Sequence, residues 1–574
     1  MSPLETSLEA PLVPGSNMKG AVAGANWWFL LPSLQAKRIV CLGSPTPATL
    51  ATLAGMSDDV VVCAAQRDAA KARRGAAAAQ LTGISFIESG SPDQKRLIEA
   101  SADVVFVAGR SLRRLRARRL HEEIEPLLRP GGLAYGEFTP VLDGVLQPGK
   151  SRRHVPQIVP TNVLWLAPAS GEIRLAAPLE DSATIGYLER RFLKRTIRHR
   201  ALLRHPQRIV ERHVLANRLL PRRAALAGGP PTAAGGGPPR YLQRLAAESG
   251  VALERHRWGL AAPGEFRSQK VLFFLFGIDG KDVPDYVVKI TRDPRLNPRL
   301  ENERRALEMI HHAGFPAART LPRPVFFGYE HGLAVLGETA VDGIPFLQRT
   351  EATPHCPLAG AAIDWLVELG VATAGPPAGG VRAVAGQLEA LFERFCRIYR
   401  VSRAYESFLA SQIDSLAGSE TGFPLVFQHG DPGPWNLLVT ANGEPAFLDW
   451  EAAEPEGMPL CDLFHFVRSY GIRVSRAAGT NDPMRSFEEQ FLAESDLGRL
   501  LVGKTGRFSA EAGLATELVA PLFYFCWMQR ALKEVTRLHP RRLDQGRYVN
   551  LLRASIEGRE SPGLRRLFTL SVDE

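Results

Sequence analysis

A stretch rich in glycine and proline near the middle of the chain limits the folds that are open to it. In "LAGGPPTAAGGGPPR", residues 226–240, nine of fifteen residues are Gly or Pro. Helices and strands rarely tolerate that density, because proline lacks a backbone donor and glycine loses the most freedom on ordering. We therefore predict a linker that separates independently folded parts. A chain of 574 residues has room for them, since domains usually have about 100–200 residues.

Short apolar runs alternate with helical or turn-rich segments between residues 36 and 188. The runs that read as strands are 38–43, 58–65, 83–89, 102–109, 131–138 and 162–168. The early runs are continuously apolar, which is typical of parallel strands covered on both faces. This rhythm predicts an α/β domain with an open, mostly parallel sheet, preceded by an N-terminal extension at 1–35.

A very basic segment at 189–223 leads into the glycine and proline stretch, and together they fill 189–240. Its apolar residues recur at helical spacing and predict an amphipathic helix as far as about Pro206. They are Leu188, Phe192, Leu193, Ile197, Leu202 and Leu203. We interpret the arginines as a solvated helix face, with contact to a membrane surface or an anionic glycan as the alternative. Nucleic acid is disfavoured, because aromatic residues are not interleaved with the basic ones.

Beyond the linker the pattern changes from strands to helices. A glycine-containing meander at 259–290 is followed by a helical stretch at 297–314, and from about 357 the pattern is mainly helical. We predict an α+β domain of two lobes. The small lobe and a hinge occupy 241–343, and a larger helical lobe occupies 344–574.

Composition favours a cytoplasmic protein. The six cysteines are scattered without metal-ligand spacing, which favours reduced thiols. The N-terminus lacks a signal-peptide pattern, and no apolar run approaches the roughly 20 residues that a membrane span needs. The net charge of +10 would fit an anionic partner, but arginine far outnumbers lysine, so we weigh only local clusters. Peripheral contact with a membrane through the basic segment remains open.

Carboxylates and an amide gather in "HGDPGPWN" (429–436) and "FLDWE" (447–451). Two prolines make the first stretch a stiff loop, and Asp449 ends a short apolar strand. A hairpin would bring Asp449 beside Asn436, and two oxygen ligands suit Mg²⁺, which completes its shell with phosphate and water oxygens. Asp431, earlier on the same loop, is then placed to accept a hydrogen bond from an attacking hydroxyl.

The pattern H-G-D-x-x-x-x-N followed by D-W-E resembles the aminoglycoside phosphotransferase and choline kinase family, which has a protein-kinase-like fold. The resemblance covers roughly 241–574. It implies transfer of the γ-phosphoryl group of ATP (or GTP) to a hydroxyl of a small molecule, with Mg²⁺ as cofactor. In these terms Asp431 is catalytic, and Asn436 and Asp449 are the metal ligands.

The same resemblance implies roles for residues upstream of the motif. Lys289 in "YVVKI" matches the lysine that holds the α- and β-phosphates, and Glu303 matches the helix glutamate that pairs with it. Glu301 is the competing candidate for that glutamate. Gly264 and Ser268 lie where the family has its phosphate-covering loop, which is matched here by one glycine rather than several.

Further residues complete the site that the resemblance implies. Backbone groups near Glu338 would contact adenine at the hinge, and Asp462 in "CDLFHF" would brace the catalytic loop. We interpret His429 as a bracing residue rather than a base. Trp435 and Trp450 are interpreted as packing residues.

Purely structural interpretations compete with these assignments. An Asp–Asn pair taken alone braces a loop more often than it binds a metal, and only the ordered set of motifs favours a nucleotide site. His311 and His312 are adjacent on a helix and therefore face different directions, which argues against a shared metal.

The N-terminal domain resembles class I S-adenosylmethionine-dependent methyltransferases. In "EEIEPLLRPGGLAYGEF" (122–138) a helix leads through a Pro-Gly-Gly turn into a strand, as in that family. The cofactor motif is degenerate, because Cys41 stands at the acidic position, and Pro45 and Pro47 replace two of the glycines that follow Gly43. The second strand ends in alanine where a carboxylate would bind ribose. These losses argue against S-adenosylmethionine and favour docking or substrate presentation.

The sequence thus predicts a small-molecule kinase with an alcohol group as acceptor. The helical stretch at 517–535 is apolar and aromatic with few acidic groups, which favours a sugar or a glycan- or lipid-related alcohol over an aminoglycoside. Two alternatives stay open. One is a catalytically silent, kinase-like nucleotide-binding module in an interaction or regulatory protein, and the other is a bifunctional methyltransferase and kinase.

Overall fold

The computed structural model describes residues 26–91, 101–108, 124–138, 163–167, 173–193, 224–228, 237–262 and 270–571. The chain divides into two compact units. The first, here called the sheet unit, comprises Leu12–Leu300 and Pro324–Ala340. The second, here called the helical unit, comprises the described residues of Glu301–Arg323 and Val341–Glu574.

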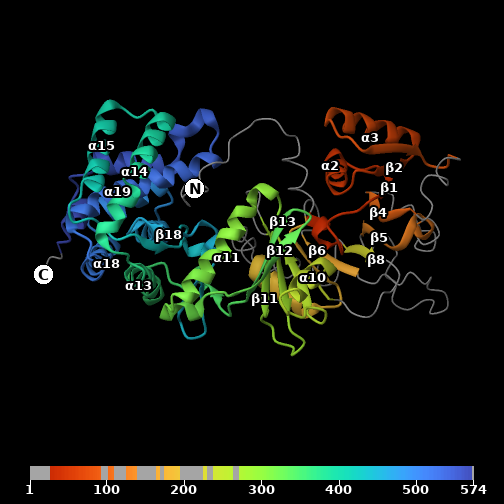
Figure 1. Ribbon diagram of the computed structural model, residues 1–574, viewed down its shortest axis with the longest axis horizontal. Coiled ribbons are helices and arrows are strands. Elements are labelled where there is room, and N and C mark those ends of the chain that lie inside the picture. Colours follow the sequence, from red (N-terminus) through yellow and green to blue (C-terminus); the bar gives the residue numbers. More distant parts are fainter. Residues whose placement is uncertain are drawn as a thin grey trace. The chain divides into compact units, whose positions relative to one another are not determined.

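Five parallel strands form one end of the large sheet in the sheet unit. Their order is β3 (Ile84–Glu88), β2 (Val60–Ala64), β1 (Ile39–Gly43), β4 (Ala102–Ala108) and β5 (Leu128–Phe138). The central strands β1, β2 and β4 are almost entirely buried, which explains their continuous apolar runs. Helices α2 (Pro47–Met56) and α3 (Gln66–Ala78) follow β1 and β2 and lie beside them (Figure 1). The arrangement agrees with the predicted α/β sheet.

A five-stranded antiparallel ladder forms the other end of the same sheet. Its order is β12 (Pro324–Glu330), β13 (Leu333–Thr339), β11 (Tyr286–Thr291), β10 (Lys270–Phe276) and β9 (Arg257–Ala261). Strands β9, β10 and β11 are the meander predicted at 259–290. Helix α11 (Asn297–His312) follows, and Gly314, with φ +68°, lies just beyond its end.

Three further strands join the two ends into one sheet of 13 strands. They are β7 (Leu175–Pro178), β6 (Val163–Ala167) and β8 (Ala224–Gly228). Strand β7 pairs with β9, so that Leu175 lies opposite Ala261, and β8 lies between β5 and β6. The predicted linker at 226–240 is therefore wrong at its start, since residues 226–228 belong to β8. Hydrogen bonds to both neighbouring strands stabilise this small-residue segment, and Gly occupies only its last position.

Two described helical segments lie before the basic segment and after the predicted linker. Helix α7 (Ser182–Leu188) continues into a π-helical turn at Glu189–Leu193, where Leu188 and Phe192 pack on the sheet. The apolar spacing expected from Leu188 onward is thus seen as far as Leu193, and residues 194–223 lie outside the described part. Residues 229–236 also lie outside it, and helix α10 (Arg240–Ala247) begins where the linker was predicted to end.

The helical unit has a core of packed helices. Its main helices are α13 (Pro357–Ala372), α14 (Pro377–Tyr399), α15 (Arg403–Ala417), α16 (Cys461–Ala477), α18 (Asp496–Ala512), α19 (Val519–Glu534), α20 (Arg547–Glu557) and α21 (Pro562–Thr569). Helix α19 is buried along most of its length and contacts α14, α15, α16 and α20. Helices α14 and α15 lie beside it in Figure 1. These main helices all lie within 344–574, where the helical lobe was predicted.

Two small β-structures in the helical unit carry the motif loop. Strand β15 (Val426–Gln428) pairs with β18 (Glu454–Gly457), while β16 (Leu437–Val439) lies between β14 (Ile344–Pro345) and β17 (Pro445–Phe447).

All six cysteines are free thiols and five of them are buried. Within the described ranges, no helix is both long and apolar enough to cross a membrane.

Candidate active site

The motif loop leaves strand β15 and returns through a β-hairpin. Gly430 has φ +78°, and a Cβ atom at this position would lie 1.9 Å from the backbone oxygen of Ala452. Glycine is therefore required here for both its conformation and its lack of a side chain. The two prolines keep the loop short, and it closes in a single 3₁₀ turn at Pro434–Asn436.

The hairpin that follows brings the two predicted metal ligands to one place. Leu437 on β16 lies opposite Phe447 on β17, and the amide of Leu448 donates to the carbonyl oxygen of Asn436 at 2.8 Å. Asp449 is the next residue and has a left-handed backbone, with φ +70°. The predicted hairpin is confirmed, and it places Asp449 directly after the residue bonded to Asn436.

The side chain of Asn436 has a defined orientation. Its Nδ2 donates to the backbone oxygen of Asp431 at 3.0 Å and to Asp431 Oδ2 at 3.3 Å. The amide oxygen Oδ1 is therefore the atom available to a cation. Among the residues that the structure describes, no three His, Cys, Asp or Glu side chains form a metal cluster. One amide and one carboxylate are the few-ligand, oxygen-only set that fits Mg²⁺ with a bound phosphate.

Two cationic or polar side chains face the carboxylate of Asp431. His465 Nε2 lies 3.3 Å from Asp431 Oδ1, and Arg530 Nη1 lies 3.4 Å from the same atom. Burial raises the pKa of Asp431, but the His465 hydrogen bond and the Arg530 charge outweigh it and hold this pKa below its usual range. The side chain is 37% exposed, so the ionised carboxylate is accessible to an acceptor hydroxyl.

Sequence reasoning missed both neighbours of Asp431. His465 lies one helical turn after Asp462 in the quoted "CDLFHF", and that spacing could have indicated it. Arg530 lies in 517–535, which was interpreted as an apolar surface, and its place in the sequence carries no comparable signal. Burial lowers the pKa of His465 to about 3, so its ring is neutral.

Asp462 and His429 hold the loop in place. The carboxylate of Asp462 accepts hydrogen bonds from the amides of His429, at 2.6 Å, and Gly430, at 3.1 Å. His429 is fully buried, and burial lowers its pKa to about 4. The amide of Asp431 donates to His429 Nδ1 at 3.2 Å, so the proton of the neutral ring is on Nε2, which donates to the oxygen of Leu448 at 2.9 Å. Both side chains thus make the contacts expected of bracing residues.

Helix α11 contacts the segment around Asp449 from within the helical unit. Glu303 is fully buried and its Oε1 accepts a hydrogen bond from the amide of Trp450 at 2.9 Å. The neighbouring Asn302 donates to the oxygen of Ala453 at 2.9 Å. Glu303, rather than the half-buried Glu301, is therefore the glutamate that faces the Asp-Trp-Glu segment.

In the sheet unit, Lys289 and Glu338 form a buried ion pair. Lys289 Nζ on β11 lies 2.8 Å from Glu338 Oε2 on β13, and both side chains are less than 10% exposed. The prediction for Glu338 concerned only backbone contacts at a hinge, and the structure adds this side-chain pairing. Gly264 and Ser268 lie outside the described residues.

The two tryptophans of the motif differ in their surroundings. Trp450 is completely buried and packs against Trp365 and His429, as predicted. Trp435 is 51% exposed, so its interpretation as a packing residue is wrong. Its ring is nearly perpendicular to that of the buried His465, with 6.2 Å between ring centroids.

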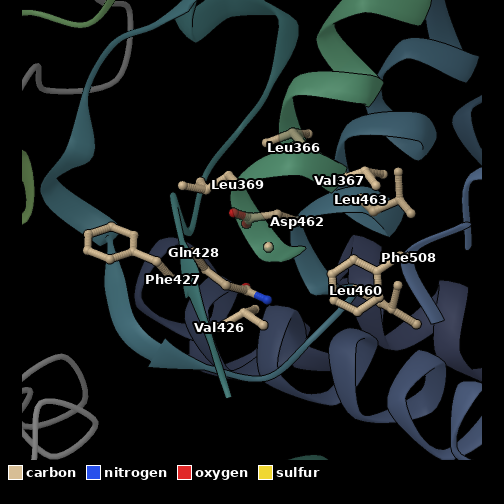
Figure 2. A pocket seen from close by; sticks show the side chains of 11 residues that line it. Leu366, Val367, Leu369, Val426, Phe427, Gln428, Leu460, Asp462, Leu463 and Phe508 are labelled. Carbon is tan, nitrogen blue, oxygen red and sulfur yellow. The ribbon is translucent and has the colours of Figure 1, made fainter. Parts of the chain in front are cut away.

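A small cavity lies beneath the loop, between β15, α13 and the start of α16 (Figure 2). Its volume is about 20 Å³, and its lining is mainly apolar, with Asp462 as its one carboxylate. A volume of this size holds about one water molecule. The cavity is therefore too small for a nucleotide or a sugar.

One protein-family model matches the part of the chain that contains these residues. The model of the phosphotransferase enzyme family (APH) matches residues 269–489. This range includes Lys289, Glu303, the motif loop and Asp462. No curated protein matches the chain.

Several solved structures match parts of the chain, each with low identity and a TM-score below 0.5. The bifunctional kinase-methyltransferase WbdD has 13% identity and a TM-score of 0.26, covering 88% of this chain and 89% of that chain. Aminoglycoside phosphotransferase APH(3'')-Id from Streptomyces rimosus, in complex with ADP and streptomycin, has 17% identity and a TM-score of 0.26, covering 44% and 90%. A putative fructosamine-3-kinase from Haemophilus somnus has 11% identity and a TM-score of 0.32, covering 55% and 95%.

Proposed function

We propose that this chain is a small-molecule kinase that transfers the γ-phosphoryl group of ATP or GTP to an alcohol. One observation carries the proposal: the carboxylate of Asp431 is accessible and lies beside His465 and Arg530, on a loop that also holds Asn436 and leads to Asp449. The family match over 269–489 supports the same reaction class.

The reaction assigned to Asp431 is in-line phosphoryl transfer. The acceptor hydroxyl donates a hydrogen bond to Asp431, its oxygen bonds to the γ-phosphorus, and the bond from that phosphorus to the nucleoside diphosphate oxygen breaks. The proton passes to Asp431 late, which fits a carboxylate of low pKa, because the loose transition state requires little base strength. Asp431 therefore acts chiefly by orienting the hydroxyl.

Other residues supply charge and position in this proposal. Asn436 and Asp449 would hold Mg²⁺, which when bound neutralises the phosphate oxygens. Lys289 steadies the non-transferred phosphates, and Glu338 keeps its ammonium group oriented through their 2.8 Å contact. His429 and Asp462 maintain the loop conformation through the hydrogen bonds described above.

The acceptor is proposed to be a sugar or a glycan- or lipid-related alcohol. Helix α19, which contributes Arg530 beside Asp431, presents apolar and aromatic residues and no Asp or Glu before Glu534. A pocket for a cationic aminoglycoside would instead require acidic groups. Contact with a membrane or glycan through 189–223 remains a proposal, because most of that segment lies outside the described residues.

For the parallel part of the sheet unit we propose docking or substrate presentation rather than methyl transfer. Cys41 on β1 is fully buried at the position where a methyltransferase carries an acidic residue, and β2 ends at Ala64. Calorimetric titration with S-adenosylmethionine tests this proposal. A measurable heat of binding would favour the bifunctional alternative.

Incubation with γ-labelled ATP or GTP and Mg²⁺ tests the reaction itself. The panel contains sugars, amino alcohols and aminoglycosides, and we expect labelled phosphate on a sugar-like alcohol. Magnesium-dependent nucleotide binding without transfer to any acceptor would instead favour the catalytically silent module. Efficient labelling of an aminoglycoside alone would contradict the proposed acceptor class.

A further inference from the structure

Helix α16 carries three polar side chains at intervals of three residues, and the first two contact the motif loop. Asp462 accepts the two loop amides, and His465, three residues later, lies 3.3 Å from Asp431 Oδ1. Arg468 follows after three more residues, on the same helix face. It is therefore displaced from His465 by only about 4.5 Å along the helix axis. All of these residues belong to the helical unit.

Arg468 is a buried cation whose hydrogen-bonding capacity is largely unused. The residue is 3% exposed, and its Nε and Nη2 atoms have no hydrogen-bond partner within the described part of the chain. Its guanidinium group lies over the ring of Tyr548, 5.3 Å from the centroid. Burial lowers the pKa of Arg468 to about 10, so the group remains charged at neutral pH. A buried guanidinium without acceptors is costly, and an anionic ligand would supply them.

The side chains around Arg468 also lie close to Asp431. The ring of Tyr548 lies 6.1 Å from the ring of His465, which contacts Asp431. Arg530, also nearly buried, contacts Asp431 at 3.4 Å and is close enough to lower the pKa of Arg468. One carboxylate, Glu534, offsets part of this positive charge, and it accepts a hydrogen bond from the amide of Tyr548 at 3.1 Å.

We propose that Arg468, supported by Arg530, binds an anionic group of the acceptor while Asp431 receives the acceptor hydroxyl. The inference rests on the proposed phosphotransferase function and narrows its substrate class. The acceptor is an alcohol that carries a phosphate or a carboxylate about one helical turn from the reacting hydroxyl. Arginine suits this role, because its planar group binds either anion through two parallel hydrogen bonds. The exposed ring of Trp435, beside His465, offers an apolar surface to the carbon skeleton of such an acceptor.

Matched acceptors that differ only in charge test the inference. The probes are glucose, glucose 6-phosphate and glucuronate, with choline as a cationic alcohol, and transfer is measured with γ-labelled ATP and Mg²⁺. We expect the phosphate or carboxylate sugar to have a kcat/KM at least tenfold above that of glucose. The preferred anion distinguishes a phosphorylated from a carboxylated acceptor.

Variants of Arg468 connect that preference to the side chain. Arg468→Met should raise the KM for the anionic sugar at least tenfold and leave the KM for ATP nearly unchanged. Arg468→Lys should restore part of the affinity, because it keeps the charge but loses the paired hydrogen bonds. Arg476→Gln, at an exposed position in the last turn of the same helix, is the matched control and should leave the KM for the anionic sugar unchanged.

The outcomes separate this inference from the proposed function. Two results overturn the role of Arg468 and leave the kinase assignment intact. The first is transfer to glucose or choline in preference to both anionic sugars, and the second is a preference for the anionic sugar that persists in Arg468→Met. If no probe is phosphorylated, calorimetry without nucleotide still decides the matter. Salt-sensitive binding of an anionic sugar to the native protein but not to Arg468→Met supports the inference, and equal binding or no binding to either overturns it.

Discussion

Replacing Gly430 by alanine should separate the geometry of the motif loop from the general stability of the fold. A Cβ atom at this position would lie 1.9 Å from the oxygen of Ala452, whereas real Cβ atoms essentially never come closer than 3.0 Å. The backbone must therefore open by about 1 Å, and a misplacement of that size can reduce turnover roughly 100-fold. The positive φ adds a conformational cost of about 1–2 kcal/mol for an L-residue.

Gly443→Ala provides the matched control for this prediction. Gly443 lies in the hairpin turn with φ +82°, and its nearest neighbour would be a Leu358 side-chain atom 3.9 Å away, so that only the conformational cost applies. We expect both variants to lose about 1–2 kcal/mol of unfolding free energy through φ, and only Gly430→Ala to lose about 100-fold in kcat. The measurements are urea unfolding and transfer from γ-labelled ATP. Equal kcat values for the two variants would refute the reasoning.

Three further predictions concern buried charges and buried hydrogen bonds. Burial lowers the pKa of His465 to about 3, below its ordinary 6.5. Above pH 6.5 the ring is neutral in the folded and the unfolded chain, and as the pH falls towards 3 protonation favours the unfolded chain, so that the free energy of unfolding declines. In His465→Gln, the unfolding free energy should therefore fall by about 3 kcal/mol less than in the native protein between pH 6.5 and 4. An equal fall in both proteins would argue against this reasoning. Asp462→Ala leaves two loop amides without their acceptor and should lower the unfolding free energy, measured with urea, by about 2–6 kcal/mol. Asp462→Asn should lower it by less, and equal losses in the two variants would contradict the bracing role. Lys289→Met should lower the unfolding free energy by about 3–5 kcal/mol, because Glu338 stays charged and buried, and adding Glu338→Gln should restore most of that loss. A double variant no more stable than Lys289→Met would refute the pairing.

Local patterns in the sequence anticipated much of the fold. The parallel strands, the meander and the helical unit all follow from apolar periodicity and turn residues, which act over short distances along the chain. The hairpin at Asn436 and Asp449 was predictable for the same reason. The roles of Asp431 and Lys289 rest on motif resemblance, and they stay predictions until activity is measured.

Features that depend on distant pairing were not predictable. Strand β8 was interpreted as linker, because its glycine and proline neighbours dominate the local composition, and only its pairing with β5 and β6 makes it a strand. Arg530 is 99 positions from Asp431 in the sequence, and its contact depends on how α19 packs. The joining of two strand groups into one sheet through β7 and β9 is a tertiary property of the same kind.

The most direct test of the central claim is a single-turnover measurement on Asp431→Asn. The variant should bind ATP and Mg²⁺ with nearly native affinity, because Asn436 can still donate to the backbone oxygen at position 431 and an asparagine there keeps a side-chain oxygen for the second hydrogen bond. Its transfer of labelled phosphate to the best acceptor of the panel should fall by about 10²–10⁴-fold. The exposed Asp414→Asn serves as the control and should transfer at the native rate. A native rate in Asp431→Asn would contradict the proposed role of this carboxylate and with it the account of the site.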